Sequence, residues 1–250
     1  MPSWSTPDQR TTLVHGDCFE VAEQYAGQAR LIITSPPYNV GKEYEHFETW
    51  DDYFDFIGRF GELCATVLEP GGYAVVVFQV EYTSPRRIEQ VYHERFGAAG
   101  LRVITERVWA KRMGSCRARA YNSRSPRAMA THENVWTFRR SSERSWDPPR
   151  NRKRSWMSVW DTSDEPRGAL KQHPAGYPEA IPRWAIEVHC DRGSDQLVMD
   201  PFMGVATSLS AARKYGVRSV GIERDRDYYH RGQDNLLTLL TEESGGADEC

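Results

Sequence analysis

The chain has 250 residues, of which 27% are charged, and a formal net charge of -3, which suits one α/β domain with a substantial core or two small domains. No apolar run approaches the ~20 residues that cross a bilayer, and the first residues lack the basic-then-apolar layout of a secretion signal. We therefore expect a cytoplasmic protein with no membrane partner.

Short apolar runs alternate with amphipathic stretches, a pattern that predicts strands alternating with helices. The expected strands are residues 11–17, 29–34, 73–80, 101–111, 134–140, 196–200 and 218–223. The expected helices are residues 19–27, 50–68, 84–100, 177–190, 208–216 and 225–240. We expect a turn at 69–72, and a helix cap at Ser84 with Pro85 at the first helical position. This order predicts a mostly parallel sheet covered on both faces.

Positive charge is concentrated in one segment. Between Lys111 and Arg154 there are thirteen Lys or Arg residues against three acidic ones, a balance of about +10 that leaves about -13 for the rest of the chain. Aromatic residues lie within or beside this segment, and such interleaving suits a polyanion whose bases can stack. The alternative is a solvated surface over a few core aromatics, but so one-sided a block favours nucleic acid.

Residues 31–39 read LIITSPPYN and place a hydroxyl, a rigid kink and an aromatic ring directly after a strand. The apolar run predicts a buried strand, which Pro36 and Pro37 must stop because proline has no N–H to donate. Ser35 and Tyr38 flank these prolines. Taken alone, the pattern also fits an ordinary strand-ending turn with a packed tyrosine.

The run LVMDPFMGVATS predicts a second strand end, at Asp200, followed by a ligand loop. Gly204 and the small Ala206 lead into a helix expected to begin near Thr207, whose free N–H groups can bind a carboxylate or phosphate. Glu223 ends the next strand, where an acidic side chain can accept both hydroxyls of a ribose. These features predict a site for an adenosine-containing cofactor, unless the loop is only a glycine turn.

The glycines of this loop distinguish between two such cofactors. A nicotinamide dinucleotide site needs the pattern G-x-G-x-x-G, whose further glycines accommodate the pyrophosphate. The loop here reads D-P-F-M-G-V-A-T, with one glycine. S-adenosyl-L-methionine carries no pyrophosphate and therefore fits better.

Four motifs together, TSPPYNV, HPAGYPEAIP, DPFMGVATS and GIE, resemble those of the amino-methyltransferases of DNA, the N4-cytosine/N6-adenine group. The order, with SPPY early and DPF-x-G late, resembles the beta arrangement of that group, over roughly residues 11–240. The resemblance implies an α/β, Rossmann-like, S-adenosylmethionine-dependent methyltransferase fold with a circularly permuted motif order. One departure is Ala206, which replaces the second glycine of the usual F-x-G-x-G-T loop and disfavours a positive φ.

The resemblance implies a single catalytic domain over residues 1–250, with a basic insertion at 111–156 and a disordered tail at 241–250. It requires that the serine-proline loop and the glycine loop, about 170 residues apart, face each other across one pocket. Methylation of RNA or of a protein amide is disfavoured, because those enzymes typically carry Asn before P-P-Y and place the cofactor loop upstream.

The serine-proline loop gains a chemical role from this resemblance. An exocyclic amine is a poor nucleophile, because its lone pair is delocalised into the ring. Ser35 Oγ and the carbonyl of Pro36, whose direction both prolines fix, are expected to accept the two N–H groups and stabilise the developing charge. Tyr38 is expected to stack on a base flipped out of the duplex. The catalytic set is therefore Ser35, Pro36, Pro37 and Tyr38.

Contacts to the cofactor also follow from the resemblance. Asp17 would accept the adenine amine and Cys18 would donate a backbone N–H, although a helix-capping role for Asp17 is an equal alternative. His173, Pro174 and Tyr177 resemble the segment that closes over the methionine end. The expected cofactor set is Asp17, Cys18, His173, Pro174, Asp200, Pro201, Phe202, Gly204, Ala206, Thr207 and Glu223.

No metal site is expected. The five cysteines are scattered without a C-x-x-C pair, so neither a zinc site nor a disulfide framework is supported. His173 has no His or Cys partner at metal-ligand spacing. A cytosine-C5 mechanism is disfavoured, because it needs a cysteine nucleophile beside a proline and none of the five cysteines fits that pattern. His132 and Glu133 match a family element near the active site and are expected to support it structurally.

Serine at the head of SPPY resembles the N4-cytosine members, whereas Asp or Asn is commoner in the N6-adenine members. We predict N4-cytosine methylation of double-stranded DNA, with N6-adenine methylation or a catalytically weak DNA-binding module as alternatives. The basic insertion lies where the family places target recognition, and its shortness leaves open a short site, a homodimer or limited specificity. A cognate restriction endonuclease is a further suggested partner. The expected DNA contacts, to phosphates or guanine, are Arg117, Arg119, Arg124 and Arg127.

Overall fold

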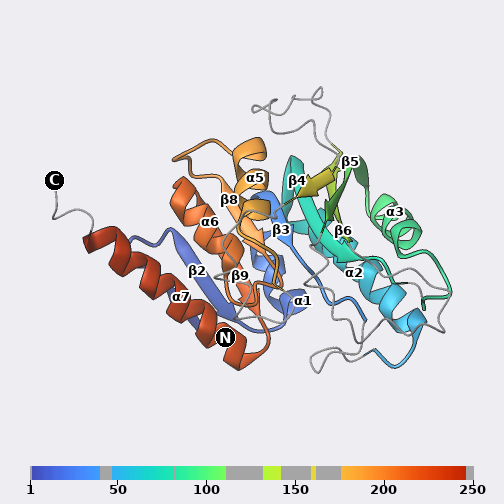
Figure 1. Ribbon diagram of the computed structural model, residues 1–250, viewed down its shortest axis with the longest axis horizontal. Coiled ribbons are helices and arrows are strands. Elements are labelled where there is room, and N and C mark those ends of the chain that lie inside the picture. Colours follow the sequence, from blue (N-terminus) through green and yellow to red (C-terminus); the bar gives the residue numbers. More distant parts are fainter. Residues whose placement is uncertain are drawn as a thin grey trace.

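The protein is described by a computed structural model that covers residues 2–39, 47–81, 83–110, 132–141, 159–161 and 176–245 (Figure 1). The described chain forms one nine-stranded sheet in the order β1-β2-β9-β8-β3-β4-β6-β5-β7. Its strands are β1 (Ser3–Ser5), β2 (Thr11–His15), β3 (Ala29–Thr34), β4 (Leu68–Gln79), β5 (Leu101–Ala110), β6 (His132–Arg140), β7 (Val159–Asp161), β8 (Leu197–Asp200) and β9 (Arg218–Glu223).

Short and long helices connect these strands. They are α1 (Cys18–Val21), the 3₁₀ turn η1 (Ala22–Tyr25), α2 (Trp50–Val67), α3 (Ile88–Ala98), α5 (Ala180–His189), α6 (Thr207–Tyr215) and α7 (Arg226–Gly245). In Figure 1, α2 and α3 lie on the side of β4, β5 and β6, whereas α6 and α7 lie beside β2 and β9. No helix in the described ranges is both long and apolar enough to cross a membrane.

Five consecutive strands of the sheet, β2-β9-β8-β3-β4, run parallel, and the predicted α/β sheet is confirmed. Side chains of β3 and β4 alternate between two apolar layers, as a strand buried on both faces requires. Ile32, Val76 and Phe78 pack with α2 and α3, whereas Leu31, Ile33 and Val77 pack with α5 and α6. The sheet is therefore sandwiched between two helix layers, which fixes the loops at its edges.

Each of the seven predicted strands is present, but several boundaries were wrong. The helix predicted from Ser84 begins at Ile88, and the Ser84 Oγ instead accepts the Arg86 N–H at 3.3 Å in a turn before it. The predicted turn at 69–72 lies inside β4, as an irregularity in its pairing with β3. The last helix continues to Gly245, so half of the predicted tail is helical. Residues 246–250 lie outside the described ranges.

Candidate cofactor and active site

A cavity of about 1090 Å³ opens where the carboxyl ends of the parallel strands meet. This is the edge at which open α/β sheets bind ligands, because the loops after neighbouring strands diverge there. Its walls come from the loops after β2, β3, β8 and β9, together with one face of α2. The serine-proline loop and the glycine loop thus face one pocket, as the sequence predicted. The predicted residues that line it are Asp17, Cys18, Ser35, Pro36, Pro37, Tyr38, Pro201, Phe202, Gly204, Thr207 and Glu223.

The carboxylate of Asp200 lies beneath this cavity and does not line it. Asp200 is 2% exposed, and burial raises its pKa, against hydrogen bonds that lower it. Its oxygens accept from Thr34 Oγ1 at 2.6 Å, from Tyr177 OH at 3.3 Å, from the Phe202 N–H at 3.1 Å and from Ser208 Oγ. The expected contact between Asp200 and the cofactor is therefore replaced by a supporting role beneath both loops.

The glycine loop after β8 turns through two left-handed residues. Gly204 has φ +51° and Ala206 has φ +64°, so the alanine adopts the conformation that favours glycine. Helix α6 then begins at Thr207, as predicted. The buried Ala206 does not line the cavity, and its methyl group lies against Gly232 of α7, where an added Cβ would approach to 3.3 Å. Ala206 thus sets the path of the loop, which corrects its expected place among the cofactor contacts.

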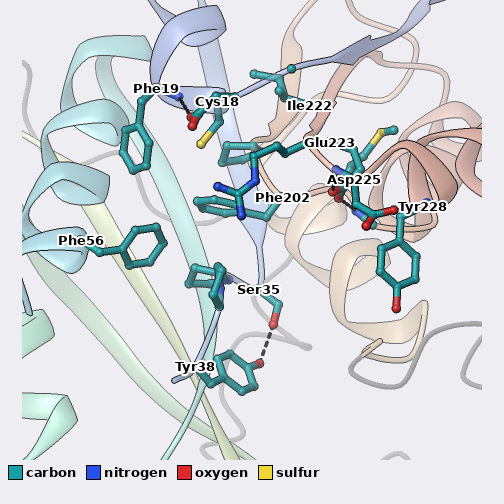
Figure 2. A pocket seen from close by; sticks show the side chains of 18 of the residues that line it. Cys18, Phe19, Ser35, Tyr38, Phe56, Phe202, Ile222, Glu223, Asp225 and Tyr228 are labelled. Atoms are coloured by element: carbon teal, nitrogen blue, oxygen red, sulfur yellow. Dashed lines mark hydrogen bonds between the residues drawn. The ribbon is translucent and has the colours of Figure 1, made fainter. Parts of the chain in front are cut away.

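Glu223 links the glycine loop to the end of β9. Its Oε2 accepts the Gly204 N–H at 2.9 Å, and its Oε1 accepts the Asp225 N–H at 2.8 Å. Burial raises the pKa of Glu223 to about 6. Each oxygen keeps a further lone pair, so the carboxylate can still accept hydroxyl groups from a ligand. Figure 2 shows Glu223 between the Phe202 ring and Asp225 in the pocket wall.

The loop after β2 gives Asp17 the helix-capping role, and its contact with the cofactor stays a prediction. Asp17 Oδ1 accepts the Phe19 N–H at 2.9 Å and so caps α1, and Asp17 also lines the cavity. Burial raises the pKa of the Cys18 thiol, which therefore stays protonated and is a weak nucleophile. Capping leaves the second carboxylate oxygen of Asp17 available to the cavity.

An aromatic wall that was not predicted from the sequence faces this loop. Phe56 lies 5.9 Å from Phe19 and 5.8 Å from Phe202, measured between ring centroids. The guanidinium of Arg59 lies 4.2 Å above the centre of the Phe19 ring. Phe56 and Arg59 are three residues apart on α2, the spacing of one helix face, but the same spacing is typical of core packing. Rings in this arrangement can bind a flat heterocycle.

The serine-proline loop is tied to β6. Ser35 Oγ and Tyr38 OH are 2.5 Å apart (Figure 2), and Tyr38 OH donates to Glu133 Oε2 at 3.2 Å. Tyr38 is 6% exposed and Glu133 is 5% exposed. Burial, followed by the charge of Glu133, raises the pKa of Tyr38 well above its usual value, so the phenol is neutral. Stacking of Tyr38 on a flipped base stays a prediction.

Charge along the cavity is unbalanced towards acids. Its acidic side chains are Asp17, Glu48, Asp52, Asp55, Glu223, Asp225 and Asp227. Its basic side chains are Arg59, Arg224, Arg226 and Arg231. This excess of acids favours a cationic ligand over an anionic one. The described part of the chain holds no cluster of three His, Cys, Asp or Glu residues suited to a metal.

Several predicted site residues lie outside the described ranges. They are His173, Pro174, Arg117, Arg119, Arg124 and Arg127. Tyr177 is described: it lines the cavity and donates to the buried carboxylate of Asp200.

The mostly parallel sheet with its ligand cavity at the carboxyl edge defines a Rossmann-like α/β fold. The solved structure of the cytosine-N4-specific PvuII DNA methyltransferase superposes with a TM-score of 0.72 at 21% identity, over 90% of this chain and 85% of that one. The chain belongs to the DNA methylase family, whose sequence profile matches residues 29–234.

Further relatives agree with this assignment. The type II methyltransferase M.ScaI of Streptomyces caespitosus is 26% identical over 249 residues, which cover 91% of this chain and 81% of M.ScaI. TTHA0409, a putative DNA modification methylase of Thermus thermophilus solved with S-adenosyl-L-methionine, superposes with a TM-score of 0.67 at 20% identity, over 91% of this chain and 93% of that one. The family and cofactor predicted from the sequence are thereby confirmed.

Proposed function

We propose that this protein transfers the methyl group of S-adenosyl-L-methionine to the exocyclic N4 amine of cytosine in double-stranded DNA. The observation that carries this proposal is the uncharged hydroxyl of Ser35, which lies in the same cavity as Glu223 and the glycine loop. The cytosine-N4 specificity of the PvuII enzyme, which shares this fold, supports the choice of base.

The cofactor end of the cavity is suited to a nucleoside with a positive charge. Glu223 retains lone pairs that can accept the two ribose hydroxyls, and Asp17 retains an oxygen for the adenine amine. The rings of Phe19 and Phe202 can contact the adenine faces. The acidic lining favours the sulfonium of the bound cofactor over its neutral thioether product.

The other end of the cavity is suited to an amine. Ser35 Oγ accepts one N–H of the target amine and the Pro36 carbonyl accepts the other, which draws the nitrogen towards sp³ geometry. When bound, the cofactor would supply a methyl group on a sulfonium for transfer to the amine nitrogen, and the electron pair of the carbon–sulfur bond would stay with sulfur. The nitrogen then releases a proton to solvent.

Two alternatives are tested in one experiment. Purified protein is offered DNA, RNA and protein with cofactor labelled in the methyl group, and the methylated DNA is digested for mass spectrometry. We expect label in DNA as N4-methylcytosine. N6-methyladenine alone would replace the cytosine proposal. Cofactor-dependent thermal stabilisation without transfer would identify a DNA-binding module that has lost turnover.

The partners and location suggested by the sequence are proposals of the same kind. We propose a cytoplasmic enzyme, active alone or as a homodimer, with a restriction endonuclease that cleaves the same target sequence when it is unmethylated. Light scattering in solution tests the dimer. Protection of methylated plasmid from a set of endonucleases tests the shared target, and plasmid that stays fully cleavable would count against it.

A further inference from the structure

A chain of three side chains connects the serine-proline loop to the interior of the sheet. Ser35 Oγ lies 2.5 Å from Tyr38 OH (Figure 2), and Tyr38 OH lies 3.2 Å from Glu133 Oε2. Glu133 is paired with Gln79 of β4 on one side and with Trp109 of β5 on the other. Its backbone is therefore held on both sides, and its carboxylate is a fixed reference point for Tyr38.

The hydrogen atoms of this chain can be assigned by counting donors. A carboxylate only accepts, so the single hydrogen of Tyr38 OH points to Glu133. In the contact between the two hydroxyl groups, Ser35 must therefore donate and Tyr38 accept. Both lone pairs of Ser35 Oγ stay available, and the raised pKa of Tyr38 keeps the phenol able to donate.

We propose that Glu133 is a positioning residue for methyl transfer: through Tyr38 it fixes the Ser35 hydroxyl as an acceptor towards the target amine. This inference rests on the proposed function. Without the carboxylate, Tyr38 OH is able to donate to Ser35, and the Ser35 hydrogen is then able to turn towards the N–H groups of the amine. Two donors would then face each other where an acceptor is needed.

The burial of Glu133 agrees with this role. A carboxylate that is 5% exposed costs free energy that an apolar side chain of similar volume on β6 would not. Val135 and Thr137, which follow it at alternate positions of the strand, are likewise buried, so Glu133 belongs to a buried row of side chains on β6. A packed apolar side chain cannot fix the direction of the Tyr38 hydrogen bond, whereas the carboxylate of Glu133 can.

Substitutions that change the direction of this hydrogen bond distinguish a positioning role from a structural one. The two roles predict opposite effects of a second substitution on the rate of methyl transfer. In Glu133→Leu, Tyr38 OH turns to Ser35, and the single-turnover rate of methyl transfer to DNA is expected to fall at least about tenfold. Adding Tyr38→Phe to Glu133→Leu removes the wrongly placed donor. The double variant is therefore expected to transfer methyl groups about threefold or more faster than Glu133→Leu alone. A structural role predicts that the two losses add.

The matched control is Glu106→Leu, which removes an exposed acid from the neighbouring strand β5. Its rate, and the cofactor Kd of every variant, are expected to stay within about twofold of the wild type. If thermal melting shows that Glu133→Leu is unfolded, Glu133→Gln takes its place. Tyr38→Phe is then expected to cause no further loss of methyl-transfer rate when it is added to Glu133→Gln.

The outcomes separate this inference from the function on which it rests. A wild-type protein that methylates no DNA would refute the proposed function. An active wild type with a Glu133→Leu rate within about twofold of it, or a double variant no faster than Glu133→Leu, would overturn the role of Glu133 alone.

Discussion

The hydroxyl of Thr34 donates a 2.6 Å hydrogen bond to the carboxylate of Asp200, across 166 residues of sequence. Thr34 directly precedes the serine-proline loop, and Asp200 directly precedes the glycine loop. The same carboxylate accepts from Tyr177, which lines the cavity, and from Ser208 in the first turn of α6. The two halves of the predicted active site are therefore joined at their bases by one buried acceptor.

Thr34→Val tests the hydrogen bond between Thr34 and Asp200, because valine keeps the shape of threonine and removes the donor. One acceptor position of the buried Asp200 would lose its partner, which is expected to lower the free energy of unfolding by about 1–3 kcal/mol. Chemical denaturation measures this change. Thr66→Val, on the exposed surface of α2, is the matched control and is expected to stay within about 0.5 kcal/mol of the wild type. Equal changes in the free energy of unfolding for Thr34→Val and Thr66→Val would argue against a stabilising role of the Thr34–Asp200 hydrogen bond.

Ala206 gives a prediction that the family pattern alone would get wrong. Restoring the usual glycine relieves a left-handed alanine, a gain of about 1 kcal/mol, but it also removes a buried methyl group worth about 0.8 kcal/mol. Ala206→Gly is therefore expected to change the free energy of unfolding by less than about 1 kcal/mol. Ala206→Val places a branched residue at φ +64° against Gly232 and is expected to cost more than about 3 kcal/mol. Thermal melts that rank the two variants in the reverse order would contradict this reading of the loop.

The fold could be predicted from the sequence wherever long-range packing and local pattern agree. β3 and β4 are strongly apolar, and both were predicted. β1 and β7 have three residues each and form only by pairing with β2 and β5, so no local pattern marks them. Helix α7 continues beyond its apolar pattern, and near its end Glu243 forms an ion pair with Arg213 of α6 at 2.8 Å.

The site could be predicted where a motif carries the chemistry, as in the serine-proline and glycine loops. Arg59 and Phe56 could not, because a helix face that lines a cavity has the same periodicity as one that packs in a core. Asp200 was assigned to the cofactor because it heads a motif. Its burial, and the donors that gather around it from distant segments, are visible only in three dimensions.

Acidification is expected to weaken cofactor binding through Glu223. Burial raises its pKa to about 6, so folding of the unliganded protein is favoured by proton uptake and that contribution is lost as pH rises through this value. Cofactor binding has the opposite requirement, because only the carboxylate can accept both ribose hydroxyls. We expect the Kd for S-adenosyl-L-methionine to be roughly tenfold weaker at about pH 5 than at about pH 7.

Calorimetry at several pH values checks this dependence. Glu223→Gln cannot titrate and is expected to bind weakly at every pH, whereas Glu62→Gln, on the exposed face of α2, is expected to follow the wild-type curve. A Kd for the wild type that does not vary with pH would show that the ribose contact is made elsewhere.

Ser35→Ala separates the two ends of the cavity. Loss of the hydroxyl removes an acceptor that acts on the target amine, so turnover is expected to fall by about 100-fold. The proposed cofactor contacts come from other loops, so the cofactor Kd is expected to stay within about twofold. Steady-state kinetics and calorimetry measure the pair of values. Ser244→Ala, at the exposed end of α7, controls for the loss of a hydroxyl as such, and equal losses of turnover and cofactor affinity in Ser35→Ala would count against an acceptor role.

The segment predicted to be a basic insertion, residues 111–156, suggests how DNA binding responds to salt, although its residues 132–140 form strand β6 of the sheet. If Arg117 and Arg119 each contact a phosphate, replacing both by alanine is expected to weaken binding uniformly across sequences and to reduce the slope of log K against log salt by about 2. Fluorescence anisotropy at a series of salt concentrations measures that slope. Arg192→Ala, an exposed arginine after α5, removes a similar charge away from the insertion and is expected to leave the slope unchanged. A wild-type affinity that barely varies with salt would mean that this insertion does not bind the phosphate backbone, and that the protein holds its DNA through contacts to bases instead.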